Sequence, residues 1–176
     1  MLVLDGSYGE GGGQMVRTAL SLAALTGVPL RLDHIRAGRP KPGLRPQHLA
    51  AVQALALITR ADLSGDQIGS SSLTFAPRDI LPGRYSLDVA EKVGSAGSVC
   101  LIAQALLPVL AFARAPSTVT LRGGTHVPWS PPAHYLMAVF LPTLRAMGLA
   151  AQLELQAWGF YPRGGGQIAP AAPAGA

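Results

Sequence analysis

Residues 5–14 form a glycine loop that encloses one candidate metal ligand. The loop holds five glycines, among them Gly11, Gly12 and Gly13, together with the carboxylate of Glu10. Glycines let a backbone approach a ligand closely, and the start of a helix offers free N–H groups to an anion. A carboxylate would repel phosphate unless Glu10 holds a divalent cation such as Mg²⁺ that bridges to the phosphate oxygens. The alternative is a tight strand-to-helix turn in which Glu10 stabilises the helix dipole.

A basic loop at residues 36–46 is the second candidate binding element. Five of the chain's 14 cations lie within fifteen residues: Arg31, Arg36, Arg39, Lys41 and Arg45. Prolines stiffen the loop, and arginine can hold a terminal phosphate through two parallel hydrogen bonds. No aromatic residue is interleaved, so the pattern favours a phosphate end over stacked bases. The alternative is a solvated charged face that binds nothing.

Three further polar residues of the first half could reach the same anion. Arg17 lies in the first turn of a predicted helix, while Gln47 and His48 open the next one.

The second half of the chain offers uncharged candidates instead. Residues 123–132 replace the arginines with apolar and proline residues, and such a flat loop could stack a purine. Gln104 is a polar residue within an apolar stretch, and its side-chain amide needs a hydrogen-bond partner, which could be an adenine edge or a backbone carbonyl. We interpret His34, His126 and His134 as structural.

The elements that must position these residues occur twice. Glycine, helix and proline-loop signals of the first half recur 86 to 88 residues later. Apolar spacing predicts helices over 14–25, 47–59, 99–112 and 132–147, with short strands between them. The pattern predicts an α+β fold of two tandem βαβαββ units, each a four-stranded sheet with two helices on one face. We expect the units at 1–85 and 86–168, followed by a solvated low-complexity tail at 169–176.

Composition sets the broad class of protein. With 49% apolar and 13% charged residues over 176 positions, the chain is not intrinsically disordered. Its longest apolar run, residues 99–113, is too short to cross a membrane and is interpreted as a buried helix. No signal peptide is recognisable, so a cytoplasmic location without a membrane partner is expected. The net charge of +5 favours an acidic partner.

Six blocks of sequence resemble the RNA 3′-terminal phosphate cyclases in order and spacing. They are residues 9–17, 35–44, 47–49, 94–98, 123–125 with 131–133, and 159–166. The resemblance implies ATP-dependent conversion of an RNA 3′-phosphate to a 2′,3′-cyclic phosphate through adenylylated intermediates. It implies RNA with a 3′-phosphate end and ATP as partners, and Mg²⁺ or Mn²⁺ as the metal.

The resemblance also assigns roles to residues of this sequence. Glu10 would be the metal ligand, and Arg17, Arg39 and Gln47 would act on phosphates. Arg36 and His48 would be secondary contacts beside the loop glycines. Gln104 and Pro131 would lie at the adenine.

One departure from the family pattern affects the expected activity. The family places its nucleophilic histidine in a third repeat, and none of the four histidines here falls at that motif. The isolated chain is therefore expected to be inactive and prone to self-association. Two alternatives are a non-catalytic cyclase-like RNA-binding or assembly factor and, by analogy of fold alone, an enolpyruvyl-transferase-like enzyme.

Overall fold

The computed structural model describes residues 1–89 and 96–175. The chain divides into two compact units between Ile80 and Leu81. This division precedes the boundary expected at residue 86, which falls inside a strand of the second unit. Gly94 and Ser95, which open one of the recognised sequence blocks, lie outside the described residues.

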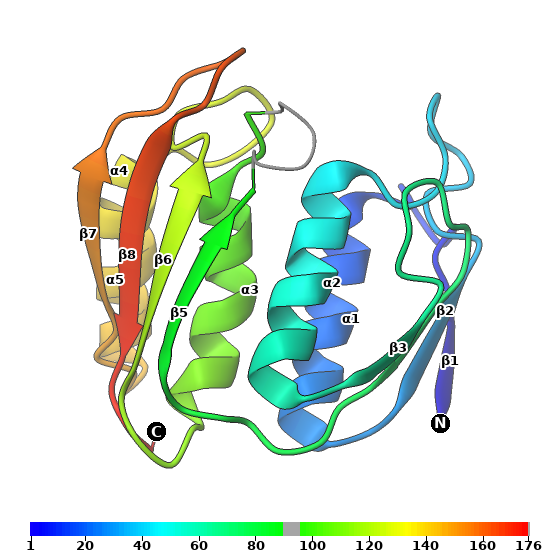
Figure 1. The fold of residues 1–176 in the computed structure, drawn as a ribbon, viewed down its shortest axis with the longest axis horizontal. Coiled ribbons are helices and arrows are strands. Elements are labelled where there is room, and N and C mark those ends of the chain that lie inside the picture. The colour runs from blue at the N-terminus through cyan, green and yellow to red at the C-terminus, as the bar shows by residue number, and fades with distance from the viewer. Residues whose placement is uncertain (90–95, 176) are drawn as a thin grey trace. The chain divides into compact units, whose positions relative to one another are not determined.

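The first unit is a βαβαββ repeat. Its elements are β1 (Leu2–Asp5), α1 (Gly13–Thr26), β2 (Leu30–Asp33), α2 (Pro46–Thr59), β3 (Asp62–Ser64) and β4 (Leu73–Ala76). The sheet has the order β1-β2-β4-β3, with β1 parallel to β2 and the other neighbours antiparallel. Both helices lie on one face of this sheet, as expected (Figure 1).

The second unit repeats this order, with its second helical segment divided into three parts. It contains β5 (Arg84–Asp88), α3 (Val99–Ala111), β6 (Ser117–Gly123), α4 (Ala133–Tyr135), a π-helical stretch η1 (Leu136–Phe140), α5 (Leu141–Ala146), β7 (Gln152–Ala157) and β8 (Gly166–Ala172). Its sheet order, β5-β6-β8-β7, is equivalent to that of the first unit. The α+β fold of two tandem repeats is therefore confirmed.

The helix predicted over 132–147 is helical but not uniformly α-helical. The stretch η1 lies between α4 and α5, and Pro142 follows it. Proline has no N–H to donate to the carbonyl four residues earlier, so the α-helical ladder is interrupted here.

Alternating apolar residues bury one face of each sheet. Leu30 and Leu32 of β2 and Leu73 and Phe75 of β4 are all buried beneath the helices of the first unit. The apolar run at 99–113 forms α3 and is mostly buried, as its composition predicts. None of the helices in the described parts of the chain is both long and apolar enough to span a membrane.

The expected solvated tail is wrong, because residues up to Ala172 form the strand β8. This strand lies between β6 and β7, and Gly166, Ile168, Pro170 and Ala172 alternate as its buried positions. Proline cannot donate a ladder hydrogen bond and normally avoids central strands. Accordingly, β8 pairs with β6 at Ala172 and Ala171, and the pairing resumes only at Ile168, beyond Pro170. Small side chains and prolines gave this segment the composition of a linker although tertiary pairing makes it a strand.

The position of β8 predicts the effect of shortening the chain. A chain ending at Gln167 should lose the cooperative unfolding of the second unit, because β6 and β7 would have no strand between them. Both tryptophans, Trp129 and Trp158, lie in that unit, so their fluorescence in a urea titration reports its unfolding. A chain ending at Pro173 is the control and should retain the transition. Equal transitions in the two chains would contradict the central role of β8.

Candidate functional site

The two loops singled out from the sequence meet at one edge of the first sheet. Because β1 and β2 are parallel, their carboxyl ends, Asp5 and Asp33, lie side by side. The amide N–H of Gly6 donates to the carbonyl of Asp33 at 2.6 Å and joins the two loop starts. The helices that follow the loops, α1 and α2, both begin near this edge, so their free N–H groups add to its positive potential.

Glu10 and Arg39 form an ion pair between the glycine loop and the basic loop. The Oε1 atom of Glu10 is 2.8 Å from a terminal nitrogen of Arg39. The Glu10 side chain is 86% exposed, so its carboxylate remains open to solvent. A Cβ atom on Gly12 would lie 3.1 Å from the same Arg39 nitrogen, and Gly11 has a left-handed φ of 56°. The glycines thus let the arginine lie directly against the loop.

His48 and Arg17 lie beneath the glycine loop. A Cβ atom on Gly13 would collide with Nε2 of His48 and would lie 3.3 Å from a terminal nitrogen of Arg17. The amide N–H of Arg45 donates to Nδ1 of His48 at 3.1 Å, which leaves the proton of the neutral ring on Nε2. Only glycine at position 13 permits this contact between α1 and α2.

Burial and the surrounding cations hold His48 in its neutral form. Burial lowers its pKa to about 4, and the positive charges of Arg36, Arg17 and Arg45 contribute in the same direction. At neutral pH the ring is a hydrogen-bonding group within a positive environment.

Arg17 brings a buried positive charge to this site. It is 6% exposed and donates to Oε1 of Gln14 at 2.9 Å, and burial lowers the pKa of its guanidinium. Over residues 1–89 and 96–175, no ion pair joins Arg17 to a carboxylate. A buried cation without a counter-ion is costly, so this position favours an anionic ligand.

Arg36 stabilises the conformation of the basic loop. Its backbone has a left-handed φ of 55°, and its Nη1 atom donates to the carbonyls of Lys41 and Gly43 at 2.7 and 2.9 Å. Burial lowers the pKa of the Arg36 guanidinium most, and the positive charges of Arg39 and Arg45 lower it further. Gln47 occupies the first turn of α2, one residue before His48.

The two adenine candidates belong to the second unit. Gln104 lies in the middle of α3 and is half-buried, and Pro131 lies in the segment before α4. Within the described residues, no cluster of three or more His, Cys, Asp or Glu side chains could hold a metal ion. The carboxylate of Glu10 would thus have to share any cation with water and a phosphate.

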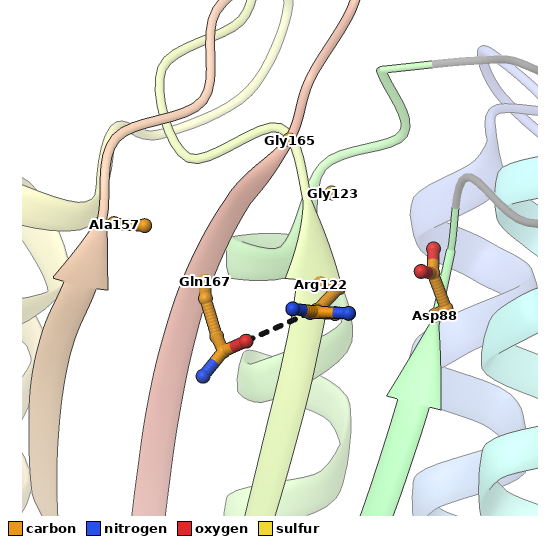
Figure 2. Close-up of a pocket in the computed structure, with 6 residues that line it drawn as sticks. All are labelled: Asp88, Arg122, Gly123, Ala157, Gly165 and Gln167. Carbon is orange, nitrogen blue, oxygen red and sulfur yellow. Dashed lines mark hydrogen bonds between the residues drawn. The ribbon is translucent and has the colours of Figure 1, made fainter.

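The second unit also contains a cavity that the sequence did not indicate. It has a volume of about 300 Å³ and is lined by Asp88, Arg122, Gly123, Ala157, Gly165 and Gln167 (Figure 2). Nε of Arg122 donates to Oε1 of Gln167 at 2.8 Å across β6 and β8. None of the site residues expected from the sequence lines this cavity.

Four aromatic rings at the ends of β6 and β7 were also missed. His126 and His134 were interpreted as separate structural histidines, yet their Nε2 and Nδ1 atoms are 2.8 Å apart. The rings of Trp158 and Phe160 complete the cluster. One signal in the sequence pointed to this cluster: a histidine occupies the same position in both repeats, as His48 and, 86 residues later, as His134.

The lowered pKa of His48 predicts how stability depends on pH. Between about pH 6.5 and 4 the unfolded chain binds a proton at His48 that the folded chain does not, so folding stability falls as pH falls. The effect is at most about 3 kcal/mol. His48→Gln replaces the accepting ring nitrogen with an amide oxygen that does not titrate, and the unfolding free energy of this variant should fall less steeply over this range. Urea unfolding followed by circular dichroism measures the difference.

An exposed histidine provides the control for this experiment. His34→Asn, in the same unit, should retain the steep fall of the unmodified chain. Parallel profiles for His48→Gln and the unmodified chain would contradict a depressed pKa at His48.

Comparison with known proteins identifies the family. Residues 8–174 match the family model described as RNA 3′-terminal phosphate cyclase. Proteins of that name from Gloeothece citriformis and Methylococcus capsulatus are 55% and 56% identical to the chain over 96% of its length, and the one from Pyrococcus furiosus is 46% identical over the same share. The alignments cover 49%, 47% and 48% of these relatives, so the chain spans about half their length. The chain belongs to the RNA 3′-terminal phosphate cyclase family.

Proposed function

We propose that this chain supplies the phosphate-binding and metal-binding part of an ATP-dependent RNA 3′-phosphate cyclase. The observation that carries the proposal is the buried guanidinium of Arg17, which has no carboxylate partner in the described residues and lies beside a histidine kept neutral by burial and by neighbouring arginines. Such a position suits a ligand that brings its own negative charge. The names of the relatives indicate that this ligand is the 3′-terminal phosphate of an RNA.

In the proposed reaction, the bond between the α- and β-phosphates of ATP breaks, pyrophosphate leaves, and AMP becomes attached to the RNA 3′-phosphate. The neighbouring 2′-hydroxyl oxygen then attacks that phosphorus, loses its proton, and displaces AMP, which leaves a 2′,3′-cyclic phosphate. Arg17, Arg39 and Gln47 would hold the phosphate oxygens and stabilise the negative charge that develops on them. Arg36 and His48 would keep the loop and its cations in position.

The glycine loop would hold the metal and one side of the phosphate. The exposed carboxylate of Glu10 fits Mg²⁺ or Mn²⁺, because Mg²⁺ commonly takes one or two carboxylates and keeps water or phosphate oxygens as its other ligands. The ion would neutralise phosphate charge. Arg39, now paired with Glu10, would turn to the phosphate, and Gly11, Gly12 and Gly13 would leave room for it.

ATP would contact the second unit through its adenine. Gln104 is a polar, half-buried side chain in a helix whose neighbouring residues are mostly buried and apolar. Its amide can both donate to and accept from the edge of a purine. Pro131 would offer a flat apolar surface to the ring.

The 176-residue chain alone should not form a covalent adduct with AMP. His48 accepts a hydrogen bond at Nδ1 and faces Gly13, and both ring nitrogens of His126 are hydrogen-bonded, to Thr125 and His134, so neither ring offers a free lone pair to a phosphate. Incubation with α-labelled ATP and Mg²⁺, followed by denaturing gel electrophoresis, should show no labelled protein. A labelled band would contradict this, and His34→Asn would then test the exposed histidine that pairs with Asp5.

The basic loop should distinguish RNA ends. RNA ending in a 3′-phosphate should bind more tightly than the same RNA ending in a 3′-hydroxyl, and Arg39→Ala should remove most of that preference. A charge-assisted hydrogen bond is worth roughly 1.5–3 kcal/mol, so the loss should be about tenfold or more in affinity for the phosphate end. Titrations with matched oligonucleotides measure both affinities.

Two further variants sharpen this test. Arg39→Lys keeps the charge without the planar guanidinium and should lose part of the preference. Arg78→Ala, which removes an exposed cation paired with Asp62 elsewhere in the same unit, should retain it. Equal affinities of the unmodified chain for the two RNA ends would overturn the proposal.

A further inference from the structure

The aromatic patch, formed by His126, His134, Trp158 and Phe160, lies where β6 and β7 end. Both strands run antiparallel to β8, so their carboxyl ends lie at the same edge of the sheet. The backbone N–H of His126 donates to the carbonyl of Gly159 at 3.0 Å. The buried hydroxyl of Thr125 accepts from the N–H of Gly159 at 2.9 Å. These bonds fix the segments that carry His126, Trp158 and Phe160, and His134 reaches them from α4.

The rings of the aromatic patch are stacked rather than randomly packed. The ring centroids of His126 and Trp158 are 4.8 Å apart with an angle of 18° between their planes, and those of Trp158 and Phe160 are 6.0 Å apart with the same angle. His134 lies 4.9 Å from Trp158 and is hydrogen-bonded to His126. Trp158 is therefore held nearly parallel to His126 and to Phe160, while His134 is tilted by 39° from Trp158.

The patch remains open to solvent despite its aromatic content. Trp158 is 57% exposed and Phe160 is 54% exposed. Exposed aromatic faces held in parallel provide a platform for another flat ring. A nucleobase fits this description, because it presents a π-face for stacking and a polar edge that the imidazole nitrogens can meet.

The internal repeat gives the patch a counterpart in the phosphate site. His134 follows His48 by 86 residues, and each lies in the first turn of the helix that follows the second strand of its unit. In the first unit this position adjoins arginines, whereas in the second it adjoins uncharged rings. The repeated scaffold thus presents a surface suited to an anion in the first unit and a surface suited to stacking in the second.

We propose that the aromatic patch stacks an unpaired base of the RNA substrate. The proposal rests on the proposed function for the choice of RNA, and it adds a contact with a base to contacts with the terminal phosphate. A stacking surface of this kind recognises single-stranded RNA with little preference among bases, since every base has a π-face.

The intrinsic fluorescence of the chain allows a direct test. The chain has two tryptophans, so Trp129→Phe leaves Trp158 as the reporter. Titration with a short single-stranded RNA ending in a 3′-hydroxyl should quench Trp158 fluorescence. The same RNA with abasic residues in place of its last three nucleosides should quench it much less. Both RNAs lack the 3′-phosphate, so this result does not depend on recognition of the phosphate end.

Affinity measurements give the second readout. Trp158→Ala should weaken binding of the base-containing RNA by about five- to 100-fold, the range for loss of one stacked base. It should change binding of the abasic RNA little. Trp129→Ala is the matched control, because Trp129 is fully exposed, and it should bind both RNAs as the unmodified chain does.

Two outcomes would overturn the inference. Equal quenching and equal affinity for the base-containing and abasic RNAs would show that the patch does not bind a base. Saturable quenching of Trp158 by ATP, with none by RNA, would assign the patch to the adenine of the nucleotide instead. If Trp158→Ala fails to fold, the fluorescence comparison in the Trp129→Phe chain decides alone, since there Trp158 is unchanged.

Discussion

The parallel pairing of β1 with β2 is the constraint on which the candidate site depends. It brings two loops and the starts of two helices to one sheet edge, although their residues are more than twenty positions apart in the chain. Repulsion among the cations gathered there is reduced by keeping His48 neutral and by pairing Arg39 with Glu10. Arg17 is buried and has no carboxylate partner among residues 1–89 and 96–175, and a buried cation of this kind favours an anionic ligand.

The fold, and the meeting of the glycine loop with the basic loop, could largely be predicted because their signals are local. Helical spacing, glycine loops and proline-rich loops recur in both halves, so the βαβαββ order follows from the sequence. Gly12 and Gly13 signalled a close approach, and the structure supplies the partners, Arg39 and His48. The strand β8 could not be predicted in the same way. Its alanines and Pro170 lack strand propensity, and only its place between β6 and β7 orders them.

The aromatic patch was missed for a related reason. Its rings come from segments about thirty residues apart, and no period or motif links a histidine to a distant tryptophan. Hydrogen bonds from Thr125 and His126 to Gly159 bring His126 beside Trp158. The internal repeat was the one usable hint. It places His134 at the position of His48, although the side chains around the two histidines differ.

The π-helical stretch η1 has a consequence for how this helix faces the sheet. Leu136 and Leu141 are both buried although they are five residues apart. In regular α-helical winding five residues cover about 1.4 turns, which would send the two side chains toward nearly opposite sides. The wider π winding returns them toward a common side. One additional residue is thereby absorbed without rotating the rest of the helix out of register, so its apolar stripe stays continuous across Pro142.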